Sequence, residues 1–156
     1  MSIKVGDKAP DFKLKTHQGG ELQLSTLQGS NVLILFFPFA FSGVCTKELC
    51  QTRDDIAFYN SANAKVVGIS VDSHHTQAKF AEVNGLDFPL LSDFNKEVMT
   101  SYGAIYDDFI GYYKGVAKRS AFVVDKEGVV RYAEVLESAG DIPNFEAIQK
   151  VLGELN

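Results

Sequence analysis

Residues 32–37 form an unbroken apolar run that is too short to cross a membrane and too continuous for a strand with one face in water. A spanning helix needs about 20 apolar residues, whereas a strand covered on both faces is apolar at every position. Pro38 ends the run, and a helical pattern follows from about Val44 to Tyr59. We therefore expect a central strand at 31–37 that leads through a turn into the first long helix of an α/β sheet.

Predicted strands and helices alternate through the rest of the chain. Gly19-Gly20 separates two alternating segments and predicts an N-terminal β-hairpin. The segment 25–29 is expected to form a short turn of helix, and 104–118 a loop. Further strands are predicted at 64–71, 88–91, 120–125 and 129–135, and further helices at 73–84, 95–102 and 144–155. This order predicts one α/β domain over residues 1–156 with a mixed central sheet.

Length and charge exclude several functional classes. The chain has 156 residues, enough for one domain, and 20 acidic against 15 basic residues argue against nucleic-acid binding. Residues 1–8 lack the apolar core of a secretory signal, so we expect the reducing cytoplasm and no membrane association. In that compartment the two cysteines are expected to be free for redox or metal chemistry. Two cysteines alone cannot fill a four-ligand zinc site, and the adjacent His74 and His75 would face different ways on a helix, so we expect no metal. No glycine-rich nucleotide motif occurs, and we expect no cofactor.

Cys45 falls where the predicted central strand has ended and the first long helix begins. Sites in open α/β sheets favour the carboxyl ends of strands. The unpaired N–H groups and the positive dipole end of a helix stabilise a thiolate in its first turn. This position suits a reactive cysteine, although a small buried thiol is an equally common fate.

The neighbours of Cys45 have plain structural interpretations beside the chemical ones. Ser42 can accept a hydrogen bond from a helix-end N–H as an N-cap, or donate to an oxygen near the sulfur. Pro38 presets the turn that leaves the strand. Glu48 is either a partner for backbone N–H groups at the helix start or a solvated charge. Arg119, taken alone, reads as a surface charge at a strand edge, like the adjacent Lys118.

Residues 38–45, Pro-Phe-Ala-Phe-Ser-Gly-Val-Cys, resemble the Pro-x-x-x-Thr/Ser-x-x-Cys signature of the peroxiredoxins, and Glu48 fits a Cys-x-x-Glu extension. Residues 5–12, 88–93 and 119–125 are similar to the family's opening, middle strand and arginine-bearing strand, in the family's order. The similarity spans essentially the whole chain. It is strongest to the peroxiredoxin Q (bacterioferritin comigratory protein) and alkyl hydroperoxide reductase E types.

The resemblance implies a thioredoxin-like fold with an N-terminal hairpin and an antioxidant thiol peroxidase that reduces hydrogen peroxide and organic hydroperoxides. Carried over to this chain, Cys45 is the peroxidatic nucleophile and Pro38 shields it from water. Ser42 hydrogen-bonds the peroxide, and Arg119 polarises it and stabilises the thiolate. Fixed donors of this kind stabilise the charge that moves from sulfur to the leaving oxygen. The aromatic residues Phe39, Phe41, Phe109, Tyr112 and Tyr113 are expected to pack in the core or to form an apolar collar or a dimer contact.

Cys50 follows Cys45 by five positions, the spacing of the resolving cysteine in the peroxiredoxin Q type. On an intact helix the two Cα atoms would lie about 8.6 Å apart, beyond the roughly 7 Å that a disulfide tolerates. We therefore expect oxidation to unwind the first turns after Cys45. The alternative is a structural Cys50, with an external thiol resolving the Cys45 sulfenic acid.

A thioredoxin-like disulfide oxidoreductase is the competing activity, but it requires Cys-x-x-Cys, whereas this chain has Cys-x₄-Cys. A peroxidase that forms an internal disulfide is expected to use thioredoxin or a similar dithiol as reductant. Both a monomer and a homodimer are compatible with the sequence.

Overall fold

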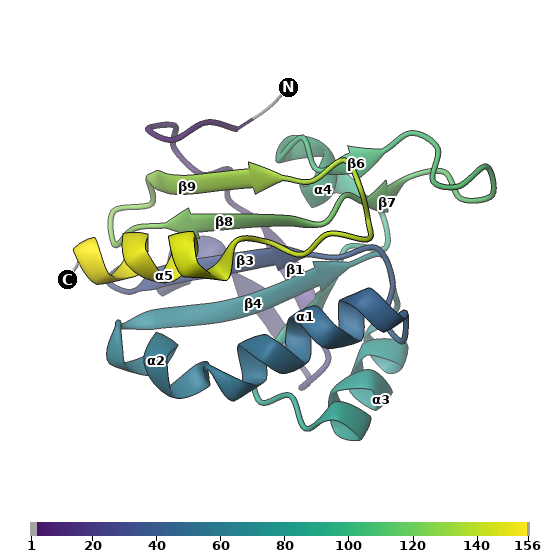
Figure 1. Cartoon of the computed structure of the whole chain (residues 1–156), viewed down its shortest axis with the longest axis horizontal. Helices are drawn as coiled ribbons and strands as arrows, with labels where there is room; N and C mark the ends of the chain where they lie inside the picture. The colour runs from purple at the N-terminus through teal and green to yellow at the C-terminus, as the bar shows by residue number, and fades with distance from the viewer. Residues whose placement is uncertain (1–2, 156) are drawn as a thin grey trace.

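The computed structural model describes residues 3–155, in which a seven-stranded sheet is flanked by helices (Figure 1). The strands of this sheet are β1 (Lys13–Thr16), β2 (Glu21–Gln23), β3 (Asn31–Phe36), β4 (Ala64–Ser70), β5 (Leu90–Ser92), β8 (Ser120–Val124) and β9 (Val130–Val135). The helices are α1 (Gly43–Asp54), α2 (Ile56–Ser61), α3 (His74–Asn84), α4 (Glu97–Ser101), α5 (Phe145–Glu154) and the 3₁₀ helix η1 (Leu24–Leu27).

The strand order β2-β1-β5-β4-β3-β8-β9 confirms a mixed sheet. β3 pairs in parallel with β4 and antiparallel with β8, and all six of its residues are buried, as the apolar run predicts. The hairpin of β1 and β2 extends the sheet beyond β5 through an antiparallel pairing. The β8–β9 hairpin closes the other side next to β3. The strand that leads to Cys45 therefore lies inside the sheet, with a partner on each side.

Two apolar layers sandwich the sheet, and alternate residues of β3 reach one or the other. Leu33 and Leu35 belong to the layer that includes residues of α1, α2, α3 and α5. Ile34 and Phe36 belong to the layer that includes η1 and α4. Figure 1 shows α1, α2 and α5 on the near face of the sheet. Cys45 is part of the first layer, so its helix is anchored by the core.

Two sequence predictions need correction. The helix expected from Val44 to Tyr59 is two helices, because Asp55 (φ −93°, ψ 8°) ends α1 and precedes α2. Hydrophobic periodicity did not locate this break, which is a change of backbone angles at one residue. The segment 104–118 is not entirely a loop, since β6 (Ile105–Tyr106) and β7 (Val116–Ala117) pair antiparallel within it. Strands of two residues carry no periodic signal of their own.

Two helices begin at a side-chain cap, and one of them ends at a glycine. The Ser73 side chain caps α3 by accepting a hydrogen bond from the Thr76 N–H, and Gly85 ends it in the left-handed conformation (φ 62°). Asn144 caps α5 by accepting from the Ala147 N–H. None of the helices within residues 3–155 has the length and apolar character that a membrane crossing requires.

Gly68 of β4 generates the first prediction. A Cβ atom there would lie 2.8 Å from Leu90 Cδ2 and 3.3 Å from Phe37 Cε1. Phe37 directly precedes Pro38 of the turn that leaves β3. We expect Gly68→Ala to lower the free energy of unfolding by about 1–3 kcal/mol through overpacking. Urea denaturation measures this change.

Gly153→Ala in α5 is the matched control, because a Cβ there has no neighbour within 4 Å. It should leave stability unchanged or raise it by about 0.5–1 kcal/mol, since alanine favours a helix. Equal stability of Gly68→Ala and the wild type would contradict the tight packing of β4 against Phe37.

Candidate active site

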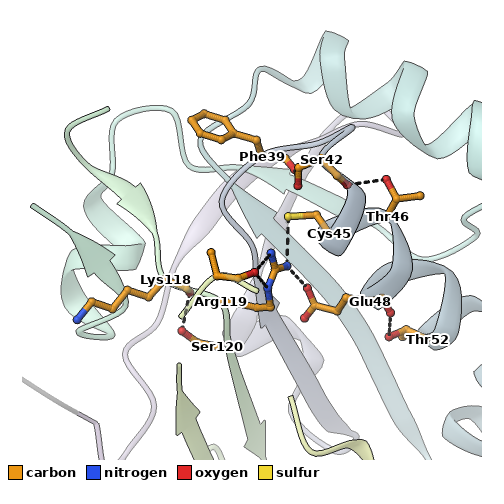
Figure 2. Close-up of polar contacts among 10 residues, drawn as sticks. Phe39, Ser42, Cys45, Thr46, Glu48, Thr52, Lys118, Arg119 and Ser120 are labelled. Atoms are coloured by element: carbon orange, nitrogen blue, oxygen red, sulfur yellow. Dashed lines mark hydrogen bonds and ion pairs between the residues drawn. The ribbon is translucent and has the colours of Figure 1, made fainter. Parts of the chain in front are cut away.

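The site forms where β3 ends and α1 begins, beside the start of β8. Pro38 is buried, residues 40–41 form a turn, and Cys45 is the third residue of α1. Phe36 at the end of β3 is paired with Ser120 at the start of β8. This antiparallel register places Arg119 next to the loop that leads to Cys45, although the two residues are 74 positions apart. Figure 2 shows the side chains of Arg119, Cys45 and Glu48 converging between α1 and β8.

The Arg119 guanidinium lies at the centre of this arrangement, and the residue is only 1% exposed. Its Nη1 donates to Cys45 Sγ at 3.1 Å and to Glu48 Oε1 at 2.8 Å. On its other side, Nε and Nη2 donate to the Ala139 carbonyl oxygen at 3.3 and 3.0 Å. The interpretation of Arg119 as a surface charge is therefore excluded. Its planar fork is held by two acids and a carbonyl at once.

Lys118 illustrates why the two adjacent cations differ. Its Nζ donates to Glu137 Oε1 at 2.8 Å and lies over the Tyr106 ring. In Figure 2 the Lys118 side chain points away from the sulfur. Successive residues of an extended segment face opposite sides, so only one of the pair can reach Cys45.

Glu48 is fully buried, which excludes the solvated charge, and neither of its oxygens accepts from a backbone N–H at the helix start. Oε1 accepts from Arg119, whereas Oε2 has no hydrogen-bond partner among the described residues. Burial raises the pKa of Glu48 to about 7, against the opposing attraction of Arg119. Burial would lower the pKa of Arg119, but its two acidic neighbours, Glu48 first, raise it above the ordinary value. The Arg119 guanidinium thus donates to both the Cys45 sulfur and the Glu48 carboxyl.

Ser42 occupies the N-cap position of α1, but its side chain makes no cap bond. Its hydroxyl instead donates to the Phe39 carbonyl oxygen at 3.2 Å, so the expected acceptance of a helix-end N–H is wrong. The helix start is held by Thr46, whose N–H and hydroxyl both donate to the Ser42 carbonyl oxygen at 2.9 Å. Thr46 was missed by the sequence analysis, although a hydroxyl one residue after Cys45 was a visible signal.

A cavity of about 280 Å³ adjoins these residues. Its lining residues are Pro38, Phe39, Ser42, Gly43, Val44, Phe109, Arg119, Ala139 and Gly140. The rings of Phe39 and Phe109 lie 6.3 Å apart, so two members of the predicted aromatic collar do reach the site. Phe41 is half exposed and packs on Phe80 instead, and Tyr112 is largely exposed. The role of the Ala139 carbonyl could not be foreseen, because a backbone group leaves no sequence signal.

Cys50 lies on α1 as well, but it is not bonded to Cys45, and both thiols are free. Its Sγ donates to Asn84 Oδ1 of α3 at 3.6 Å, and it is partly exposed whereas Cys45 is fully buried. The structure therefore keeps the two cysteines apart on one intact helix. Across residues 3–155, no group of three histidine, cysteine or acidic side chains is arranged to hold a metal ion.

Comparison with known proteins places this geometry in a family. The AhpC/TSA family model matches residues 5–133. The alkyl hydroperoxide reductase E of Mycobacterium bovis is 39% identical over 139 residues, which cover 85% of this chain and 86% of that protein. A chloroplastic 2-cysteine peroxiredoxin of Chattonella marina var. antiqua is 33% identical over 146 residues, which cover 86% of this chain and 72% of that protein.

A solved structure agrees with these sequence relatives. The crystal structure of peroxidoxin BcpB from Mycobacterium tuberculosis matches with a TM-score of 0.86 and 34% identity, over 99% of both chains. This match confirms the expected thioredoxin-like fold. The chain therefore belongs to the AhpC/TSA family of peroxiredoxins, and it is a thiol-dependent peroxidase.

Proposed function

We propose that Cys45 is the peroxidatic nucleophile and that Arg119 is the group that activates both the thiolate and the peroxide. The observation that carries this proposal is the 3.1 Å contact between Arg119 Nη1 and Cys45 Sγ in a buried setting. A guanidinium keeps its charge there, so it stabilises the negative sulfur at any working pH. Cys45 also lies in the first turn of α1, where the unpaired N–H groups of a helix stabilise negative charge.

The substrates are hydrogen peroxide and organic hydroperoxides, which enter through the cavity next to Ser42 and Arg119. The Cys45 thiolate attacks the terminal oxygen of the peroxide, and the S–O bond forms as the O–O bond breaks. Sulfur loses the two electrons that the peroxide gains. The departing oxygen takes a proton and leaves as water or alcohol, and Cys45 remains as a sulfenic acid. Arg119 and Ser42 stabilise the charge on the leaving oxygen, while buried Pro38 keeps water from the sulfur.

Cys50 is proposed as the resolving cysteine. Its thiolate attacks the Cys45 sulfenic acid, the S–S bond forms as the S–O bond breaks, and the departing hydroxide takes a proton and leaves as water. Because α1 holds the two residues five positions apart on a continuous helix, the first turns of α1 must unwind before the sulfurs meet. Unwinding also requires release of the Cys50 contact with Asn84.

A dithiol protein such as thioredoxin is proposed to reduce the Cys45–Cys50 disulfide, and the reducing cytoplasm is the proposed compartment. The relative named alkyl hydroperoxide reductase E supports a hydroperoxide substrate. The catalytic groups all come from one chain, so the proposed reaction needs no partner subunit and is compatible with a monomer or a homodimer.

Arg119→Lys tests the role of the guanidinium. An ammonium cannot donate to Cys45, Glu48 and Ala139 with one planar fork, so we expect kcat/KM for hydrogen peroxide to fall by about 10²–10³. Lys118→Met is the control, since Lys118 points away from the sulfur and should change kcat/KM little. Equal loss in the two variants would refute a specific role for Arg119.

Mass spectrometry after one equivalent of peroxide distinguishes the roles of the two cysteines. The wild type should form an intramolecular Cys45–Cys50 disulfide, and Cys50→Ser should accumulate a Cys45 sulfenic acid that reacts with dimedone. Cys45→Ser should consume no peroxide. A lasting sulfenic acid in the wild type would instead assign resolution to an external thiol, and peroxide consumption by Cys45→Ser would overturn the peroxidase assignment to Cys45.

Glu48→Gln tests the buried carboxyl through the pH dependence of stability. The folded pKa of Glu48 is about 7 against an ordinary 4.5, so the folded state binds its proton more tightly than the unfolded state. Between these two values the unfolded state binds fewer protons, and stability falls as the pH rises. The wild type should therefore lose a few kcal/mol from about pH 4.5 to 7 relative to Glu48→Gln, which carries no titrating group there.

Urea denaturation at a series of pH values measures this difference, because the titrations common to both proteins cancel. Glu82→Gln is the control, since Glu82 is exposed and forms a surface ion pair with the exposed Lys79. Parallel stability curves for the wild type and Glu48→Gln would show that Glu48 titrates normally in the folded protein.

A further inference from the structure

Asp72, in the segment that follows β4, connects three parts of the chain near the site. Its Oδ2 accepts from the Ala40 backbone N–H at 2.7 Å, in the turn between β3 and α1. The same oxygen accepts from Ser70 Oγ at 2.7 Å, at the end of β4. The Asp72 carbonyl oxygen accepts from Ser92 Oγ, also at 2.7 Å, at the end of β5. A carboxylate that accepts from a backbone N–H makes one of the stronger hydrogen bonds in proteins.

The turn that Asp72 contacts is strained. Phe41 has a φ of 70°, in the left-handed region that side chains with a Cβ rarely adopt. Its ring is half exposed and packs edge-on against Phe80 of α3 at 5.1 Å. Residues in such conformations persist only where the surroundings enforce them. Ala40 directly precedes Phe41, so its bond to Asp72 opposes the relaxation of this turn.

Asp72 is itself oriented by a buried frame. Ser70 Oγ, which donates to Asp72, accepts from Gln77 Nε2 of α3 at 3.0 Å, and the same amide donates to the Leu91 carbonyl oxygen at 2.8 Å. Both Ser70 and Gln77 are fully buried. The carboxylate is therefore fixed relative to β4, β5 and α3, the parts of the sheet and helix layer that do not have to move when α1 unwinds.

We propose that Asp72 is a positioning residue for the peroxidase reaction, one that holds the strained turn and thereby the start of α1 in the geometry that reacts with peroxide. The turn leads directly to Ser42, whose carbonyl oxygen receives both donors of Thr46 and so sets the first turn of α1. Loss of the Asp72 contact frees this turn to relax. The proposal rests on the proposed roles of Cys45 and Cys50.

The two halves of the catalytic cycle should respond to Asp72 in opposite directions. Attack on peroxide needs the folded turn, because Ser42, Arg119 and the helix N–H groups must surround one oxygen. Disulfide formation needs the unwound turn, because the intact helix keeps Cys45 and Cys50 apart. A contact that stabilises the folded turn accelerates the first step and slows the second.

Asp72→Ala is the test, with rapid quench and mass spectrometry following the two steps in a single turnover. We expect sulfenic acid formation to slow by about tenfold or more, and condensation to the Cys45–Cys50 disulfide to accelerate. In a Cys50→Ser background, amide hydrogen exchange of residues 43–47 should become faster with Asp72→Ala. Asp72→Asn should rescue both steps to within about threefold of the wild type, since its amide oxygen can still accept from the Ala40 N–H.

Ser73→Ala is the matched control, because it removes the cap of α3 in the same segment but leaves the Ala40 contact in place. It should change neither step. If Asp72→Ala slows both steps, changes neither, or behaves like Ser73→Ala, the proposal is overturned, and so it is if Asp72→Asn fails to rescue.

Failure of the proposed roles of Cys45 and Cys50 can be distinguished from failure of the Asp72 proposal. A wild-type protein whose Cys45 is not oxidised by peroxide would overturn the role of Cys45 and this proposal with it. A wild type that is oxidised but forms no disulfide would remove only Cys50 from the cycle. Asp72 would then be judged on the rate of sulfenic acid formation and on amide exchange in the Cys50→Ser background.

Discussion

One buried positive charge organises this protein. Taking the Arg119 guanidinium out of water is costly unless acceptors surround it, and the fold provides Cys45 and Glu48 on one side and the Ala139 carbonyl on the other. These acceptors come from α1 and from the segment before α5. They meet because β8 pairs antiparallel with β3 and ends its pairing at the site. The sheet, the first helix and the segment before α5 thus all contribute to the surroundings of one side chain.

The same arrangement leaves an imbalance that suits a reactive site. Arg119 can neutralise one negative partner, yet two acids contact its Nη1. Oε2 of Glu48 has no hydrogen-bond partner among the described residues, and burial raises the pKa of this carboxyl to about 7 despite the attraction of Arg119. A buried carboxyl that holds its proton near neutral pH leaves the guanidinium free to stabilise the sulfur. The buried Glu48 therefore lowers stability as the pH approaches neutrality, while the Arg119 guanidinium lies against Cys45.

A second tension lies in the backbone around Cys45. The turn before α1 contains a strained Phe41, and α1 itself keeps Cys45 and Cys50 too far apart for an unstrained bridge. The folded form suits attack on peroxide, and a locally unwound form suits disulfide formation. Two contacts at the edges of this segment, Asp72 with Ala40 and Cys50 with Asn84, are present in the folded form.

The sequence by itself determined the α/β class, the buried strand near residues 31–37, the helix near residues 73–84, and Cys45 at a helix start, because local periodicity and end chemistry encode these features. The resemblance of residues 38–45 and 119–125 to family motifs, and the spacing of Cys50 after Cys45, added the proposed roles. Only the tertiary structure decided that Arg119 rather than Lys118 faces the sulfur, that Glu48 is buried, and that Asp72 reaches Ala40. These facts depend on strand register and on contacts between distant segments, and no local pattern of residues specifies which side chains will share a buried space.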